Sequence, residues 1–142
     1  MRVNQLADEI GATADTVRFY TRIGYLEPSK NKSNGYKEYS TEDKHRLRFI
    51  LSARYLGFSV KDIGQILDTA KRRRSPCPLV RDLIRQRLTE TDRSFKECSD
   101  LRQRMATAIE QWDQQPDQLP TGEMICHLIE GFVAIDMQES PE

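Results

Sequence analysis

The amino-acid sequence predicts a mainly α-helical protein: a winged helix-turn-helix over residues 1–75, a long coiled-coil helix over residues 76–112, and a loop with a short helix over residues 113–142. Three observations carry this prediction. Two short amphipathic segments meet at a glycine turn, an Asn-Gly pair marks a hairpin, and a later stretch repeats apolar residues at the period of a coiled coil.

The first segment, NQLADEIG, places Leu6 and Ile10 on one face and stops at Gly11, as a helix with a glycine C-cap does. Thr13 is suited to cap a second helix, whose segment ADTVRFYTRIG again ends in glycine. Two short helices separated by a tight turn form a helix-turn-helix, in which the second helix enters a major groove of DNA.

The segment EPSKNKSNGYKEYS predicts a basic wing, because Asn34 and Gly35 lie between a lysine-rich arm and a tyrosine-rich arm. Two further helices follow. Each begins at a serine with an aspartate three residues later, at residues 40 and 59, which is the pattern of a capping box. These elements suffice for a small core with a basic face.

Charge is distributed unevenly along the chain, although the net charge is zero. Residues 1–75 carry 15 lysines and arginines against 9 acidic residues, and residues 76–142 carry 7 against 13. A basic N-terminal half that faces a polyanion is the simplest interpretation. Since no apolar run reaches the ~18 residues of a membrane span and the N-terminus lacks the apolar stretch of a signal peptide, we expect a cytoplasmic protein without a membrane partner.

Residues 78–112 form the predicted coiled-coil helix. At 1.5 Å per residue it spans roughly 52 Å, far more than the small N-terminal core covers, so its apolar stripe requires a partner. A second copy of the chain is the simplest partner, which predicts a homodimer. We expect Cys98, which lies on the stripe, to act as a small core hydrophobe. The stripe consists of Ile84, Leu88, Thr91, Phe95, Cys98, Arg102, Met105, Ile109 and Trp112.

Three cysteines far apart in a reducing compartment favour ligands, reactive thiols or core residues over disulfides. Cys77 lies between two prolines, and Pro78 suits the first helical turn, so Cys77 is predicted at or next to the helix N-cap. Free backbone N–H groups and the helix dipole favour a thiolate there, the form that binds metal or attacks electrophiles. A functional thiol at Cys77 is the prediction.

The segment after Trp112 is predicted to be a loop, because DQQPDQLPTGE has two prolines, a glycine and no apolar periodicity. It leads to Cys126 and His127 at the start of a short apolar helix. Adjacent residues of a helix point in different directions, so both need not reach one ion. Cys126 is therefore the stronger candidate ligand, and His127 is either a ligand or a surface or supporting histidine.

Three blocks of this sequence, TVRFYTRIGYLEPSKN, NGYKEYS and LGFSVKDIGQIL, resemble in this order the DNA-binding domain of the MerR family of bacterial transcription regulators, over roughly residues 1–70. The resemblance implies a regulator and not an enzyme. It also implies an antiparallel dimerisation helix, a variable effector-binding loop, and a dimer that bends and untwists double-stranded promoter DNA so that RNA polymerase engages both promoter elements.

The resemblance further implies which residues contact DNA. Lys37 replaces the arginine usual in the family, which keeps the charge but loses the bidentate fork. For each residue the alternative is a solvated surface residue or a core tyrosine. The implied contacts are Thr16, Arg18 and Tyr20 on the recognition helix, Tyr36, Lys37 and Tyr39 on the wing, and Arg54 on the following helix.

Metal sensors of the MerR family bind metal through a cysteine at the head of the dimerisation helix, contributed across the dimer, and through cysteines in the loop beyond. By this resemblance Cys77 and Cys126 are metal ligands. The chain departs from the pattern because Trp112 and Asp113 stand where a further cysteine is usual. The remaining ligands are open among His127, Asp113, Asp117, Glu123 and water.

A mixed sulfur, nitrogen and oxygen ligand set suits Zn²⁺ better than Cu(I). In the family, a cysteine at position 77 accompanies divalent ions, whereas copper and silver sensors have serine there. We therefore expect a regulator that activates metal resistance or efflux genes in response to Zn²⁺, with Cd²⁺, Pb²⁺, Co²⁺ and Hg²⁺ open.

Two other classes of function compete with metal sensing. The first uses Cys77 and Cys126 as a redox or electrophile switch, which predicts activation without metal and sensitivity to oxidants. The second, a Cys/His hydrolase, is disfavoured because the sequence offers no oxyanion loop or nucleophile elbow, and neighbouring Cys126 and His127 do not face each other as nucleophile and base.

Overall fold

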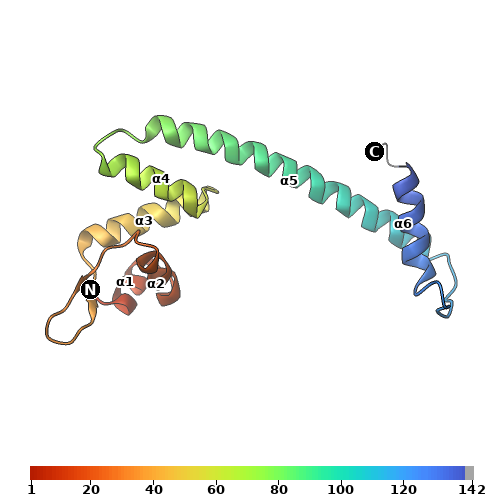
Figure 1. Ribbon diagram of the computed structural model, residues 1–142, viewed down its shortest axis with the longest axis horizontal. Coiled ribbons are helices and arrows are strands. Elements are labelled where there is room, and N and C mark those ends of the chain that lie inside the picture. Colours follow the sequence, from red (N-terminus) through yellow and green to blue (C-terminus); the bar gives the residue numbers. More distant parts are fainter. Residues whose placement is uncertain (140–142) are drawn as a thin grey trace. The chain divides into compact units, whose positions relative to one another are not determined.

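The computed structural model describes the backbone of residues 1–139 and the side chains of residues 1–133. The chain divides into two compact units, Met1–Thr89 and Glu90–Glu142. The elements are α1 (Val3–Ile10), α2 (Ala14–Arg22), β1 (Ser29–Lys30), β2 (Lys37–Glu38), α3 (Thr41–Tyr55), α4 (Val60–Lys71), α5 (Cys77–Trp112) and α6 (His127–Glu139), shown in Figure 1.

The predicted helix-turn-helix and wing are present in the N-terminal unit. Gly11 ends α1 in the left-handed conformation, with φ of 82°, and its N–H donates to the carbonyl of Ala7. Thr13 caps the next helix, because its hydroxyl accepts the N–H of Thr16 at 3.1 Å. Strands β1 and β2 pair antiparallel with Ser29 opposite Glu38, which makes a short two-stranded wing.

The serine-aspartate pairs that start α3 and α4 are complete capping boxes. In α3, the Ser40 hydroxyl accepts the N–H of Asp43, and the Asp43 carboxylate accepts the N–H of Ser40. Ser59 and Asp62 make the same reciprocal bonds in α4. Each box satisfies two N–H groups that a helix start leaves without an internal partner, so the helix boundaries follow from local sequence.

One hydrophobic core holds the N-terminal unit together, and the first turns of α5 belong to it. Leu83 is 6% exposed, and Leu79, Val80 and Ile84 pack against the same core. Arg87 forms an ion pair with the buried carboxylate of Asp62 at 3.3 Å. Sequence periodicity placed Ile84 on the coiled-coil stripe, whereas the structure packs it on this core. Fully buried members of the core are Leu6, Val17, Leu26, Leu47, Ile50 and Ile63.

Tyr25 fills the space beside α4 and leaves no room for a side chain at Gly64. Its hydroxyl donates to the carbonyl of Val60 at 2.7 Å, and its ring stacks on Tyr20 with 6.2 Å between centroids. A Cβ atom on Gly64 would overlap that hydroxyl. The side chain at residue 64 is therefore excluded by the tyrosine, not by the helix backbone.

We expect Gly64→Ala to lower the free energy of unfolding by ~1–3 kcal/mol, because overpacking Tyr25 outweighs the gain in helix propensity of about 1 kcal/mol. Urea denaturation followed by circular dichroism measures the change. In a Tyr25→Phe background the loss should shrink, since the overlapping oxygen is gone. A stabilising effect of Gly64→Ala in the otherwise unchanged protein would contradict this account.

In the C-terminal unit, the end of α5 packs against α6. The indole N–H of Trp112 donates to the carbonyl of Leu128 at 3.1 Å, and its ring meets Phe132 edge to face with 6.2 Å between centroids. Ala108 is 6% exposed. Trp112, which the sequence placed on the coiled-coil stripe, therefore serves as the anchor of α6.

Between these two ends, the apolar stripe of α5 is exposed. We define the α5 seam as Leu88, Phe95, Cys98, Met105 and Ile109. Phe95 is 75% exposed, and Leu88 and Ile109 are each 60% exposed. Large apolar side chains spaced along one helix face at this exposure indicate a surface for association. No helix in the described residues combines the length and apolar character needed to cross a bilayer.

Candidate functional site

The second helix of the helix-turn-helix exposes a cation. Arg18 on α2 has a side chain that is 57% exposed, and its guanidinium pairs with the carboxylate of Asp15 at 3.0 Å. Thr16 lies one residue beyond that aspartate, with its hydroxyl 2.9 Å from the hydroxyl of Thr13. Because Asp15 is also exposed, the pair is weak and exchangeable, so Arg18 remains available to another anion.

The wing presents an aromatic ring and a lysine next to each other. Tyr36 is 56% exposed, and Lys37 beside it is exposed. The side-chain oxygen of Asn34 accepts the N–H of Tyr36 at 3.0 Å, which shapes the turn together with Gly35 at φ of 74°. The predicted Asn-Gly turn thus places the tyrosine and the lysine at the surface.

Arg18 and Lys37 line one cleft of about 410 Å³, together with the start of α1. We name it the N-terminal cleft and define it by Arg2, Asn4, Arg18, Tyr36 and Lys37. The guanidinium of Arg2 lies over the ring of Tyr36, 4.3 Å from the centroid. Sequence reasoning missed Arg2, because nothing in the local pattern indicates that the start of α1 meets the wing.

Two tyrosines predicted to contact DNA are core residues. Tyr20 is 5% exposed and Tyr39 is 3% exposed. The hydroxyl of Tyr39 lies 2.7 Å from that of Thr21, which joins the wing to α2. Both side chains are therefore those of core tyrosines, and they support α2 and the wing from the interior.

Arg54 is exposed, and it donates to the carbonyl of Phe58 at 2.7 Å, which braces the turn after α3.

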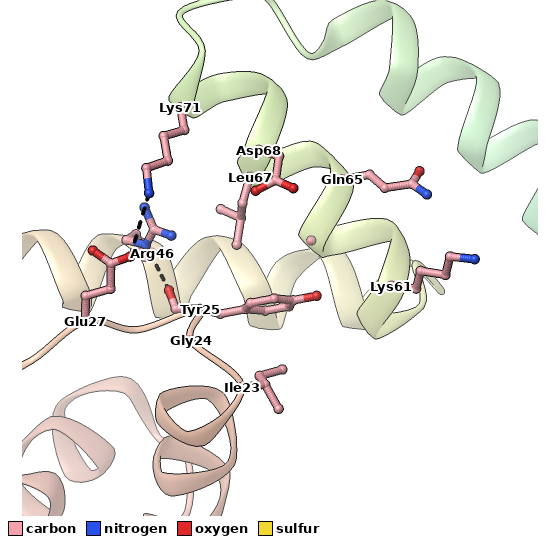
Figure 2. Close-up of a pocket in the computed structure, with 11 residues that line it drawn as sticks. Ile23, Gly24, Tyr25, Glu27, Arg46, Lys61, Gln65, Leu67, Asp68 and Lys71 are labelled. Atoms are coloured by element: carbon pink, nitrogen blue, oxygen red, sulfur yellow. Dashed lines mark hydrogen bonds and ion pairs between the residues drawn. The ribbon is translucent and has the colours of Figure 1, made fainter.

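A second cavity, of about 380 Å³, lies among the loop after α2 and helices α3 and α4 (Figure 2). Charges of both signs line it: Glu27 faces Lys71 at 4.0 Å, and Asp68, Arg46 and Lys61 also belong to the lining. Burial, followed by the charge of Asp68, raises the pKa of Tyr25, so this hydroxyl stays protonated at neutral pH. None of the predicted site residues lines this cavity.

Cys77 lies at the head of α5, as predicted. The N–H of Val80 donates to the carbonyl of Pro76 at 2.9 Å, which makes Pro76 the cap and Cys77 the first helical residue. The N–H of Cys77 donates to the hydroxyl of Ser75 at 3.3 Å. Its thiol is exposed, so Cys77 combines solvent access with a helix start that packs into the core of the N-terminal unit.

Cys126 also lies at a helix start, where it is the residue before α6. The N–H of Glu130 donates to its carbonyl at 3.1 Å, and the Glu130 carboxylate accepts the N–H groups of Cys126 at 2.7 Å and Ile125 at 2.9 Å. This reciprocal cap fixes the backbone of the half-exposed Cys126. Sequence reasoning did not identify Glu130, since its role depends on how the loop enters the helix.

His127 is oriented by the loop before it. Its Nε2 lies 2.9 Å from the carbonyl oxygen of Pro116. Because a carbonyl oxygen only accepts, Nε2 carries the hydrogen, and in a neutral imidazole Nδ1 then keeps the lone pair. Nδ1 is then the atom of His127 with ligand capacity, and the bond to Pro116 has the form that orients metal-bound histidines.

The potential metal ligands do not form a complete set in one chain: the described residues contain no group of three or more His, Cys, Asp or Glu side chains close enough to hold an ion. Cys77 and Cys126 belong to different compact units. Thiolate and imidazole are nonetheless the donors that soft and borderline divalent ions prefer. A site built on them requires donors from separate parts of the chain or from a second copy.

Comparison with known proteins identifies the family. Residues 1–70 match the family described as MerR HTH family regulatory protein, and residues 44–108 match the one described as MerR, DNA binding. The HTH-type transcriptional regulator HmrR of Rhizobium leguminosarum bv. viciae is 35% identical over 102 residues, which cover 72% of this chain and 78% of the relative.

Two further proteins resemble this chain, one in sequence and one in fold. The mercuric resistance operon regulatory protein of Bacillus cereus is 25% identical over 116 residues, covering 82% of this chain and 88% of that protein. The crystal structure of the regulator PbrR691 from Ralstonia metallidurans CH34 in complex with lead(II) superposes with a TM-score of 0.70 at 22% identity, covering 92% and 98% of the two chains. With its helix-turn-helix, wing and long α5, this chain belongs to the MerR family of DNA-binding transcription regulators, and not to an enzyme family.

Proposed function

We propose that this protein is a homodimeric, metal-responsive transcription activator that senses a divalent ion through Cys77 and Cys126. The observation that carries the proposal is the placement of both thiols at the start of a helix, one exposed and one half-exposed. It is supported by relatives that are named for resistance to mercury or were crystallised with lead. The regulated genes would be those of metal resistance or efflux.

DNA is proposed to bind across α2 and the wing. Thr16 and Arg18 would meet the major groove, and Tyr36 and Lys37 the backbone beside it, with Arg54 as a further contact. All except the half-buried Thr16 are exposed. Tyr20 and Tyr39 act in this proposal by holding α2 and the wing in register, because their side chains are buried.

Zn²⁺ is the proposed effector, because thiolates with a nitrogen or carboxylate donor suit it. Cd²⁺, Pb²⁺, Co²⁺ and Hg²⁺ share enough of this chemistry to compete. His127 would contribute Nδ1 or support the site through its bond to Pro116. Asp113, Asp117, Glu123 or water would complete it, and the second copy of the chain would supply the partner thiolate.

The packing of α5 supports a route by which metal binding at Cys77 would reach the DNA. The next turns of α5 place Leu79, Val80 and Leu83 in or against the core of the DNA-binding unit. A force on the Cys77 thiolate is therefore transmitted to that unit without an intervening loop. Binding of the ion supplies free energy on the scale of many kcal/mol, whereas deforming a promoter costs a few. The two DNA-binding units of the dimer would move, and RNA polymerase would engage the realigned promoter.

We expect Cys77→Ser and Cys126→Ser each to bind DNA within a few-fold of wild type yet lose metal-dependent transcription, because each removes a strong ligand outside the DNA surface. Operator DNA is obtained by selecting a duplex from a random pool with wild-type protein. Run-off transcription is then titrated with each divalent ion and with Cu(I). His127→Ala should give a partial defect.

Cys98→Ser is the matched control, since it removes a thiol from the α5 seam and should leave the metal response intact. Cys77→Ser that still responds to every divalent ion at wild-type concentrations would overturn the assignment. Activation of the metal-free protein by peroxide, in the presence of a chelator, would instead favour the redox or electrophile switch.

A further inference from the structure

We propose that Arg2 is a DNA-binding residue: with Arg18 and Lys37 it holds one backbone phosphate of the operator in the N-terminal cleft, and its stacking on Tyr36 sets the position of the wing. The inference rests on the proposed DNA surface and extends it to the start of α1. It assigns a ligand class, a phosphodiester, to a cleft built from three separate elements.

The side chain of Arg2 is committed to the wing rather than to its own helix. Arg2 stands at the N-cap of α1, but it makes no side-chain capping bond. Its guanidinium instead covers the ring of Tyr36 at 4.3 Å from the centroid. A guanidinium that stacks on a ring keeps its N–H donors free at the edges, so it can hold a phosphate while it stacks.

The charges around the cleft favour binding of an anion. Three cations line it, Arg2, Arg18 and Lys37, and no carboxylate among the described residues does. The nearby Glu38 bonds to the amino group of Met1 at 3.4 Å instead. Asp15 pairs with Arg18 on the exposed surface of α2, where a phosphate can replace it. Arginines are suited to this exchange because they bind phosphate in a bidentate manner.

The contact between Arg2 and Tyr36 in the cleft also stabilises the position of the wing. Its strands are two residues each, so the hairpin itself holds the tip weakly. Arg2 supplies a contact from the start of α1 to Tyr36 near that tip. A phosphate held by Arg2, Arg18 and Lys37 together would fix the distance between the recognition helix and the wing on the DNA.

The experiment measures the affinity of Arg2→Ala for the selected duplex and for a scrambled duplex of equal length, over a range of salt concentrations. We expect about a tenfold loss on both duplexes and a salt slope reduced in magnitude by ~2, because each DNA-binding unit of the dimer loses one phosphate contact and neither loses a base contact. Arg2→Lys should retain the slope but recover only part of the affinity. Arg93→Ala, which removes a charge from the C-terminal unit, should match wild type.

Tyr36→Leu, alone and combined with Arg2→Ala, separates positioning from charge. If stacking positions the wing, the two losses are non-additive. If Arg2→Ala lowers the melting temperature, the salt slope is measured with Arg2→Gln instead, because glutamine keeps the aliphatic part of the side chain but lacks the charge. Wild-type affinity and slope in the Arg2 variant overturn this inference alone, provided that Arg18→Ala abolishes binding. Normal binding by Arg18→Ala would overturn the proposed DNA surface itself.

Discussion

Phe95→Asp should convert the protein from a dimer to a monomer at micromolar concentration. Phe95 is 75% exposed in the single chain and lies in the middle of the α5 seam. In a symmetric dimer the substitution occurs twice, so two carboxylates lose their hydration at the interface without partners. Such a change costs several kcal/mol, and about 4 kcal/mol already weakens association roughly 1,000-fold. Light scattering after gel filtration measures the mass directly.

Arg93→Asp is the matched control, because it adds the same residue on the opposite face of α5. It should remain dimeric. Ile109→Asp should dissociate the dimer as Phe95→Asp does, and both variants should retain a folded N-terminal unit, since the core of that unit contains neither residue. A wild-type protein that is monomeric at micromolar concentration would contradict the proposed interface.

Arg18→Ala should abolish binding to the selected duplex, with a loss of 100-fold or more. A charge-assisted contact from an arginine to a backbone phosphate is worth ~1.5–3 kcal/mol, and a dimer loses it in both DNA-binding units. The fold should be unaffected, because the ion pair with Asp15 is exposed and contributes little. Footprinting measures the binding, and circular dichroism checks the fold.

Asp15→Ala tests whether DNA binding depends on the guanidinium of Arg18 itself or on its ion pair with Asp15. It releases Arg18 from its intramolecular partner but leaves the cation in place, so binding should stay within a few-fold of wild type. A normal footprint from Arg18→Ala would show that α2 is not the recognition helix. Loss of binding by both variants, with intact folds, would mean that the pair positions α2 rather than contacting DNA.

Local sequence was sufficient for the boundaries of the N-terminal helices and for the two helix-start cysteines. Gly11 adopts the left-handed conformation that ends α1, and the Ser40-Asp43 and Ser59-Asp62 pairs form complete capping boxes. These signals depend on hydrogen bonds between residues at most a few positions apart. Cys77 could be placed for the same reason, because the prolines around it restrict where a helix can start.

Tertiary structure alone decided which partner covers each apolar or aromatic side chain. Periodicity put Ile84 and Trp112 on one stripe with Phe95, yet the first packs on the DNA-binding core and the second anchors α6. An apolar periodicity in the sequence indicates that one face of the helix is apolar, but it does not indicate which element packs against that face. The same holds for Tyr20, a predicted DNA contact that is 5% exposed.

The sequence by itself therefore determined the order of the elements and the residue types at each helix start, because these follow from contacts local in the chain, and three of its blocks indicated the family. The meeting of Arg2 with Tyr36 and the burial of Tyr39 were decided only when the chain folded. Each depends on the direction in which one element or loop leaves another. That direction is set by packing of the whole unit and leaves no periodic or nearest-neighbour signal in the sequence.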